Sequence, residues 1–84
     1  MRLINVAEIV VFEIIDRLLA KRDVCKCERC RLDIAAIALN NVPPNYVVST
    51  EGEVRRSINR QLKVDAGREV ENAIEKVREH PHHK

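Results

Sequence analysis

Residues 24–44 read VCKCERCRLDIAAIALNNVPP, and the expected fold is built outward from this stretch. It begins with all three cysteines of the 84-residue chain, Cys25, Cys27 and Cys30, in the order C-x-C-x-x-C. The residues from Leu32 to Asn40 then have apolar side chains at helical spacing. Pro43-Pro44 removes two backbone donors and prevents the helix from continuing. The stretch therefore predicts a cysteine-bearing loop followed by a short helix.

The segment before the cysteines predicts a first helix over Leu3–Lys21. Its apolar residues recur every three or four positions and form one wide stripe: Leu3, Ala7, Val10, Val11, Ile14, Ile15, Leu18 and Leu19. Val6, Ile9 and Phe12 fall outside that stripe at about 100° per residue. A helix this apolar either lies centrally among others or presents its second strip to another copy of the chain. The pattern favours a homodimer.

A third helix is expected to begin at Thr50, because Thr50 and Glu53 have the spacing of a capping box. Apolar residues then recur at helical spacing to Val77, giving a helix of about 26 residues, or roughly 40 Å. A kink or break near Ala66-Gly67 is an alternative, because glycine weakens a helix by up to about 1 kcal/mol relative to alanine. So long a helix packs against a second subunit or has a protruding end.

The connector between the second and third helices, Asn41–Ser49, contains the triplet Tyr46–Val48, which has the residue types of a brief extended segment. One such segment has no partner strand, so no sheet is expected. We therefore predict an all-α domain of three to four helices, over residues 1–84 as a single domain, with a long C-terminal helix and a frayed tail at residues 79–84.

Composition limits the classes of function. The 15 basic and 13 acidic residues are interleaved and leave a net charge of +2, which does not favour direct binding of a nucleic-acid polymer. No apolar run approaches the ~20 residues that cross a bilayer, and no signal-peptide pattern opens the chain. We expect a cytoplasmic protein without a membrane partner.

The cysteine cluster predicts a metal site. Three thiolates in a tight turn converge on one tetrahedral ion, at Zn–S distances of about 2.3 Å. The cationic Lys26 and Arg29 favour deprotonated sulfur, and a small domain gains stability from structural zinc. Structural zinc takes four ligands, so one more is needed. The candidates are His80, His82 or His83, Asp23 or Asp33, or a group from a partner chain.

Other chemistries for the cysteines stay open. The thiols could be unligated, could hold an iron–sulfur cluster, or could form a redox switch through the C-x-x-C pair Cys27 and Cys30. A catalytic zinc with a bound water lacks a marked general base. Ser49 and Ser57 have no histidine beside them, and no phosphate-binding glycine loop is present. We expect no enzyme.

Four features of the sequence resemble the late competence development protein ComFB family. In order along the chain they are Ile14–Leu19 (IIDRLL), the C-x-C-x-x-C cluster, Asp33–Asn40 and Pro43–Val47 (PPNYV). The resemblance covers about Ile4–Gly52, and the third helix matches only in pattern. It implies an all-helical, homodimeric bacterial protein whose cysteines hold zinc. The member that gives the family its name has a fourth cysteine downstream, whereas none follows Cys30 here.

The resemblance also implies a ligand. Related cyanobacterial members are regarded as cyclic-dinucleotide receptors, and a symmetric dimer with arginines suits a two-fold symmetric dianion. The candidate ligand-binding residues are Asn40 and Asn41 for base or ribose edges, Pro44 and Tyr46 for an apolar wall, and Arg55 or Arg56 for phosphate.

Plainer roles compete with these assignments: Asn40 caps the second helix, Pro43-Pro44 ends it, and Tyr46 fills the core. Likewise, a regulatory, ligand-sensing module competes with a structural protein–protein interaction module that has no small-molecule ligand and recruits its partner through the third helix.

Overall fold

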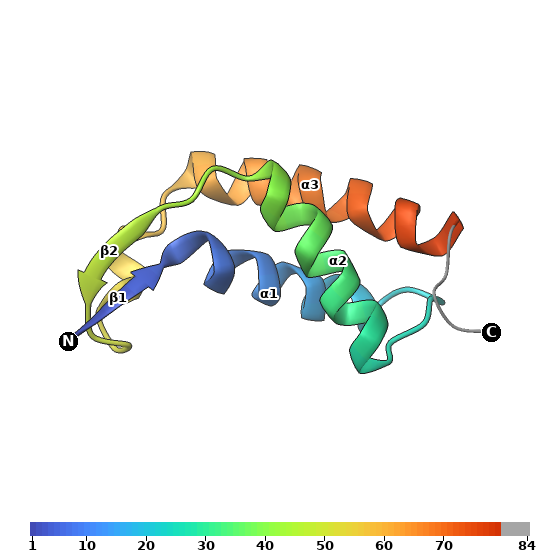
Figure 1. Cartoon of the computed structure of the whole chain (residues 1–84), viewed down its shortest axis with the longest axis horizontal. Coiled ribbons are helices and arrows are strands. Elements are labelled where there is room, and N and C mark those ends of the chain that lie inside the picture. Colours follow the sequence, from blue (N-terminus) through green and yellow to red (C-terminus); the bar gives the residue numbers. More distant parts are fainter. Residues whose placement is uncertain (80–84) are drawn as a thin grey trace.

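The structure, a computed structural model, describes residues 1–79, so the expected tail lies outside the described residues except for Glu79. Three helices and a two-stranded sheet make up the fold (Figure 1). In chain order the elements are β1 (Arg2–Asn5), α1 (Val6–Leu19), α2 (Glu28–Asn41), β2 (Tyr46–Ser49), the 3₁₀ turn η1 (Val54–Ser57) and α3 (Arg60–Glu79). The helices contact one another pairwise, which confirms a predominantly helical small domain. None of the helices in residues 1–79 is long and apolar enough to span a bilayer.

The core lies between the three helices. Most of the predicted stripe on α1 is buried there, together with apolar residues of α2 and α3. Val6, which was placed outside the stripe, is also fully buried, and Ile9 and Phe12 are half-buried. The second apolar strip of α1 is therefore covered largely within the chain. Of the two arrangements expected for so apolar a helix, α1 has the central position among the other helices.

The prediction that the chain has no sheet is wrong. β1 pairs antiparallel with β2, with Leu3 opposite Val48 and Asn5 opposite Tyr46. Asn5 explains where the strand ends, since its Oδ1 accepts hydrogen bonds from the amides of Ala7 (3.2 Å) and Asn45 (2.9 Å). Asn5 thus caps α1 and fastens it to the connector, and the first helix begins at Val6 instead of Leu3.

The second helix begins four residues earlier than Leu32, because Cys27 is its N-cap. The Cys27 sulfur accepts a hydrogen bond from the Cys30 amide (3.4 Å), and its carbonyl accepts from the Arg31 amide (3.0 Å). Cys30 is consequently a helical residue. At the other end, the Asn41 side-chain amide donates to the Ile37 carbonyl (2.8 Å), so Asn41 makes the closing side-chain bond that was assigned to Asn40.

The third helix begins later than predicted. The amides of Glu53 and Val54 bond to the carbonyl of Thr50 and lead into η1, and the chain is extended at Ile58. The Asn59 Oδ1 then accepts from the Leu62 amide (2.8 Å), which caps α3. α3 has 20 residues and runs without a break through Gly67. At about 30 Å it fits within the 41 Å length of the molecule.

Candidate metal centre

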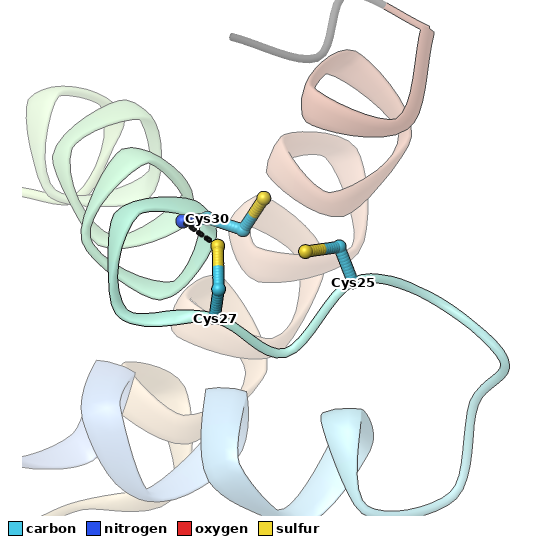
Figure 2. Close-up of side chains that lie close together, drawn as sticks. All are labelled: Cys25, Cys27 and Cys30. Carbon is cyan, nitrogen blue, oxygen red and sulfur yellow. Dashed lines mark hydrogen bonds between the residues drawn. The ribbon is translucent and has the colours of Figure 1, made fainter. Parts of the chain in front are cut away.

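The three cysteines converge at one end of the helical bundle. Cys25 and Cys27 lie in the segment that joins α1 to α2, and Cys30 lies in the first turn of α2. Their sulfur atoms all lie within 4.8 Å of one another (Figure 2), and none of the three forms a disulfide. The cluster could therefore hold a metal ion, as the spacing predicts.

The N-terminus of α2 provides a favourable setting for negative charge at this cluster. The helix dipole places partial positive charge there, and the Cys30 amide points at the Cys27 sulfur. Lys26 lies in the same segment, where its ammonium donates to the carbonyls of Arg22 (2.6 Å) and Val24 (3.3 Å). These bonds fix the turn that brings Cys25 toward Cys27.

Cys30 differs from the other two cysteines because it is buried, whereas Cys25 and Cys27 are exposed. Burial, followed by hydrogen bonding and charge interaction with Cys25 and Cys27, raises the pKa of the Cys30 thiol to about 12. Three adjacent thiolates without a cation repel one another. A divalent cation between them reverses this effect, since it stabilises the thiolate form.

Ion pairs hold the cysteine-bearing segment against the helices on both sides. Arg22 donates to Glu71 of α3 (2.7 Å), and Arg31 donates to Asp16 of α1 (2.7 Å and 3.0 Å). The loop that carries the thiols is thus attached to α3, and the first turn of α2 is attached to α1.

A small cavity of about 140 Å³ adjoins the thiols. It is lined by Asp23, Val24, Cys25, Cys30, Ile34, Ile74, Val77 and Arg78. Cys25 and Cys30 therefore share this space with residues from the C-terminal part of α3, and the ribbon of α3 runs behind the cysteines in Figure 2.

Two carboxylates were expected as possible fourth ligands, Asp23 and Asp33. Asp33 accepts from Arg29 (3.2 Å), and Asp23 lines the cavity. Within residues 1–79, the three cysteines form a candidate metal-binding group to which no aspartate, glutamate or histidine is added. The other ligands expected from this chain, His80, His82 and His83, lie outside the described residues.

The predicted ligand-binding residues do not form one site. Tyr46 and Arg55 line a second cavity, of about 460 Å³, together with Arg2, Asn5, Glu8 and Glu51. Asn41 lines a groove between α2 and α3, and Asn40, Pro44 and Arg56 are exposed and outside the lining of the second cavity. Tyr46 is 60% exposed, so it does not fill the core.

The second cavity has mixed charge. Arg2 pairs with Glu51 and Arg55 pairs with Glu13, so both arginines already face a carboxylate. Arg2 and Asn5 were not predicted as cavity residues, because only the pairing of β1 with β2 brings their strand beside Tyr46.

Three helices, a short two-stranded sheet and a converging thiol triad define a small cysteine-bearing helical domain. The family model described as late competence development protein ComFB matches residues 4–81. The chain belongs to this family.

A curated protein and a solved structure, both named ComFB of Bacillus subtilis, support the assignment. The competence protein ComFB of Bacillus subtilis strain 168 is 41% identical over 46 residues, which make up 54% of this chain and 47% of that protein. The chain therefore matches about half the length of this relative. A solved structure of the late competence protein ComFB from Bacillus subtilis superposes with a TM-score of 0.75 at 26% identity, covering 95% of this chain and 94% of the other.

Proposed function

We propose that this chain is a non-enzymatic binding domain of the competence-related ComFB type, stabilised by a structural zinc ion held by Cys25, Cys27 and Cys30. The convergence of the three sulfur atoms within 4.8 Å carries this proposal. In a tetrahedral zinc site with Zn–S bonds of about 2.3 Å, sulfur ligands lie roughly 3.8 Å apart. Cys25 and Cys27 are exposed, so their side chains have room to rotate toward that separation.

Zinc suits the donor set because soft thiolates bind it strongly and the site is enclosed on one side by packed helices. The metal connects the loop after α1 to the first turn of α2, beside the end of α3. Bound zinc contributes directly to the free energy of unfolding.

Chelation tests the proposed role of zinc. Treatment of the metal-loaded protein with an excess of a strong chelator is expected to lower its midpoint of thermal unfolding, and added zinc to restore it. A Cys30→Ser variant should start at the lower midpoint and not respond to either reagent. A Glu28→Gln variant, changed at the neighbouring exposed first residue of α2, should behave like the wild-type protein. If chelation leaves the wild-type midpoint unchanged, the thiols do not hold a structural metal.

We propose that the chain forms a homodimer in the bacterial cytoplasm. Leu3, Tyr46 and Val48 are 68%, 60% and 67% exposed, and their positions place them together on the outward face of the two-stranded sheet. A two-stranded sheet with an exposed apolar face is marginally stable alone and is covered by pairing with a second copy.

The oligomeric state tests this assembly. Leu3→Glu is expected to convert the dimer to a monomer in native mass spectrometry. Val64→Glu, at an exposed apolar position on α3, serves as its control and should leave the dimer intact. Loss of the dimer in the Val64→Glu variant alone would place the interface on α3 instead.

A second candidate function is that of a cyclic-dinucleotide receptor. It is favoured by the joint placement of Tyr46 and Arg55 on one cavity of about 460 Å³, because an aromatic ring and a guanidinium are groups that bind a base and a phosphate. The ligand must compete with Glu13 for Arg55. The alternative is a protein–protein interaction module without a small-molecule ligand.

Thermal unfolding with added cyclic dinucleotides separates these two functions. A ligand at 100 times its Kd adds about 2.7 kcal/mol to the stability of the folded state. Arg55→Ala should abolish the shift, whereas Arg56→Ala, on the same turn but outside the cavity lining, should retain it. If no cyclic dinucleotide at millimolar concentration shifts the wild-type midpoint, the receptor function is contradicted and the interaction module stands.

A further inference from the structure

A cavity of about 370 Å³, which we call the α1–α3 cavity, is lined by residues of α1, of the first half of α3, and of η1 with the residue after it. The two helices contact each other and run side by side along the molecule (Figure 1). The inner side of the cavity is apolar, because the lining residues Val10 and Ile14 are buried and Ile58 is half-buried. None of the three cysteines lines it, so it is separate from the candidate metal centre.

The outer side of the α1–α3 cavity is cationic. Three exposed basic side chains and one carboxylate line it. Arg55 pairs with the carboxylate, which belongs to Glu13. Arg17 and Lys63 form no ion pair with any carboxylate in residues 1–79. Two positive charges without a carboxylate partner therefore face one cavity, and together they attract a group with two negative charges.

Gly67 keeps the α3 side of this cavity open. A glycine inside a helix costs up to about 1 kcal/mol relative to alanine. The backbone does not require it, since Gly67 lies within α3 and has no positive φ. Close packing does not require it either, because a first side-chain carbon placed at Gly67 would meet nothing else in the fold within 4 Å. The consequence of this glycine is that the space in front of it stays empty.

We propose that the α1–α3 cavity binds a small organic dianion, a phosphomonoester with an apolar body. A phosphomonoester carries a charge of about −1.5 to −2 at pH 7, which matches Arg17 and Lys63, whereas a carboxylate supplies one negative charge. Guanidinium and ammonium groups both bind phosphate oxygens. The apolar inner side receives the body of the ligand, and small-molecule pockets have volumes of about 300–1,000 Å³.

This site is distinct from the two sites described above. Arg55 lines both the α1–α3 cavity and the cavity of Tyr46. Arg17, Lys63 and Gly67 line the α1–α3 cavity and belong to neither the lining of the Tyr46 cavity nor that of the cavity beside the thiols. Substitutions at these three residues therefore test the proposal without changing the residues proposed to hold zinc or a cyclic dinucleotide.

Isothermal titration calorimetry of the full chain with phenyl phosphate, at fixed ionic strength, tests the proposal. Inorganic phosphate tests the charge without the apolar body, phenol tests the body without the charge, and benzoate tests a single negative charge on the same ring. We expect phenyl phosphate to bind more tightly than the other three compounds. Its affinity should fall as salt is added, because the cations at the opening are exposed.

Two pairs of variants locate the bound compound. Lys63→Gln should raise the Kd of phenyl phosphate roughly three- to tenfold, whereas Lys76→Gln, on the same helix but outside the lining of this cavity, should leave it unchanged. Gly67→Leu should weaken binding further, because its side chain occupies the cavity. Gly67→Ala favours the helix to a similar degree but adds only one carbon, so it should retain most of the affinity. Far-ultraviolet circular dichroism checks that each variant is helical.

The proposal is overturned if phenyl phosphate does not bind, or if inorganic phosphate binds as tightly, since the apolar side then has no part in recognition. Equal binding of benzoate would contradict the choice of a dianion. An equal loss of affinity in Lys63→Gln and Lys76→Gln would show a general effect of charge instead of a site. Unchanged affinity in both Lys63→Gln and Gly67→Leu would place the bound compound elsewhere on the protein.

Discussion

Arg31 of α2 donates two hydrogen bonds to the carboxylate of Asp16 on α1, at 2.7 Å and 3.0 Å. The same guanidinium lies over the ring of Phe12, with its central carbon 4.6 Å from the ring centroid. Because Arg31 directly follows Cys30, these contacts fasten the thiol-bearing end of α2 to α1. They connect two residues that are 15 positions apart in the sequence.

Substitution of Arg31 by lysine should lower the free energy of unfolding by about 0.5–1 kcal/mol, because an ammonium cannot make the paired bonds and stacks less well on Phe12. Urea unfolding measures the change. Arg29→Lys is the matched control, since its partner Asp33 lies in the same helix, and it should cost less. Equal losses of unfolding free energy in the two variants would mean that the contact between α1 and α2 stabilises the fold no more than a pair within one helix.

The Asp16 carboxylate gives this contact a defined pH dependence. The hydrogen bond from Arg31 holds the pKa of Asp16 below its ordinary value of 3.8. A lowered folded-state pKa stabilises the fold above the unfolded pKa, and the stabilisation is lost as the pH falls through the folded-state pKa. Asp16→Asn should therefore be less stable than wild type at neutral pH and equally stable in strong acid.

The size of this effect is small, because the Asp16 side chain is 56% exposed and solvent screens the pair. Thermal unfolding of wild type and Asp16→Asn across the acid range measures it, and Glu13→Gln, which removes the pair with Arg55, gives a comparison on the same helix. A difference between wild type and Asp16→Asn that persists unchanged in strong acid would contradict the assignment.

Asn59 and Thr50 are both suited to cap a helix, but only Asn59 stands at the start of α3. Asn59→Ala should destabilise the fold by about 1 kcal/mol, because the Asn59 Oδ1 accepts from the Leu62 amide. Thr50→Ala should cost little, since Thr50 bonds the turn that follows through its backbone carbonyl. Chemical denaturation of both variants makes the comparison. A larger loss of unfolding free energy from Thr50→Ala would contradict this account and favour the capping box predicted for Thr50 and Glu53.

Zinc affinity should rise with pH. The raised pKa of Cys30, about 12, means that this thiol carries a proton at neutral pH and must release it to bind the metal. Each released proton increases the apparent affinity by about tenfold per pH unit. Chelator competition between roughly pH 6 and pH 8 should therefore give a positive slope, and a flat profile would show that thiolates are not the ligands.

The helices and the thiol triad follow from short-range patterns. The apolar spacing of α1 and α3 and the C-x-C-x-x-C turn are written within a few residues, so they can be predicted from one sequence. β1 could not, because only four residues form it and its pairing depends on Asn5 meeting Asn45, 40 positions away.

The sequence alone also could not show which of two similar residues takes a given role. Thr50 and Asn59 are both good cap residues, and the packing of the whole chain selects Asn59. Similarly, Tyr46 and Arg55 come to the same cavity while Asn40 and Asn41 do not, which depends on the sheet register and on the turn before α3. Such contacts between distant residues leave no pattern in any one segment.

Metal content per chain, determined by elemental analysis of the native protein, tests the central claim most directly. The account predicts about one zinc ion per chain, with Cys25, Cys27 and Cys30 protected from thiol reagents until the metal is removed. A metal-free native protein in which all three thiols react at once would contradict it.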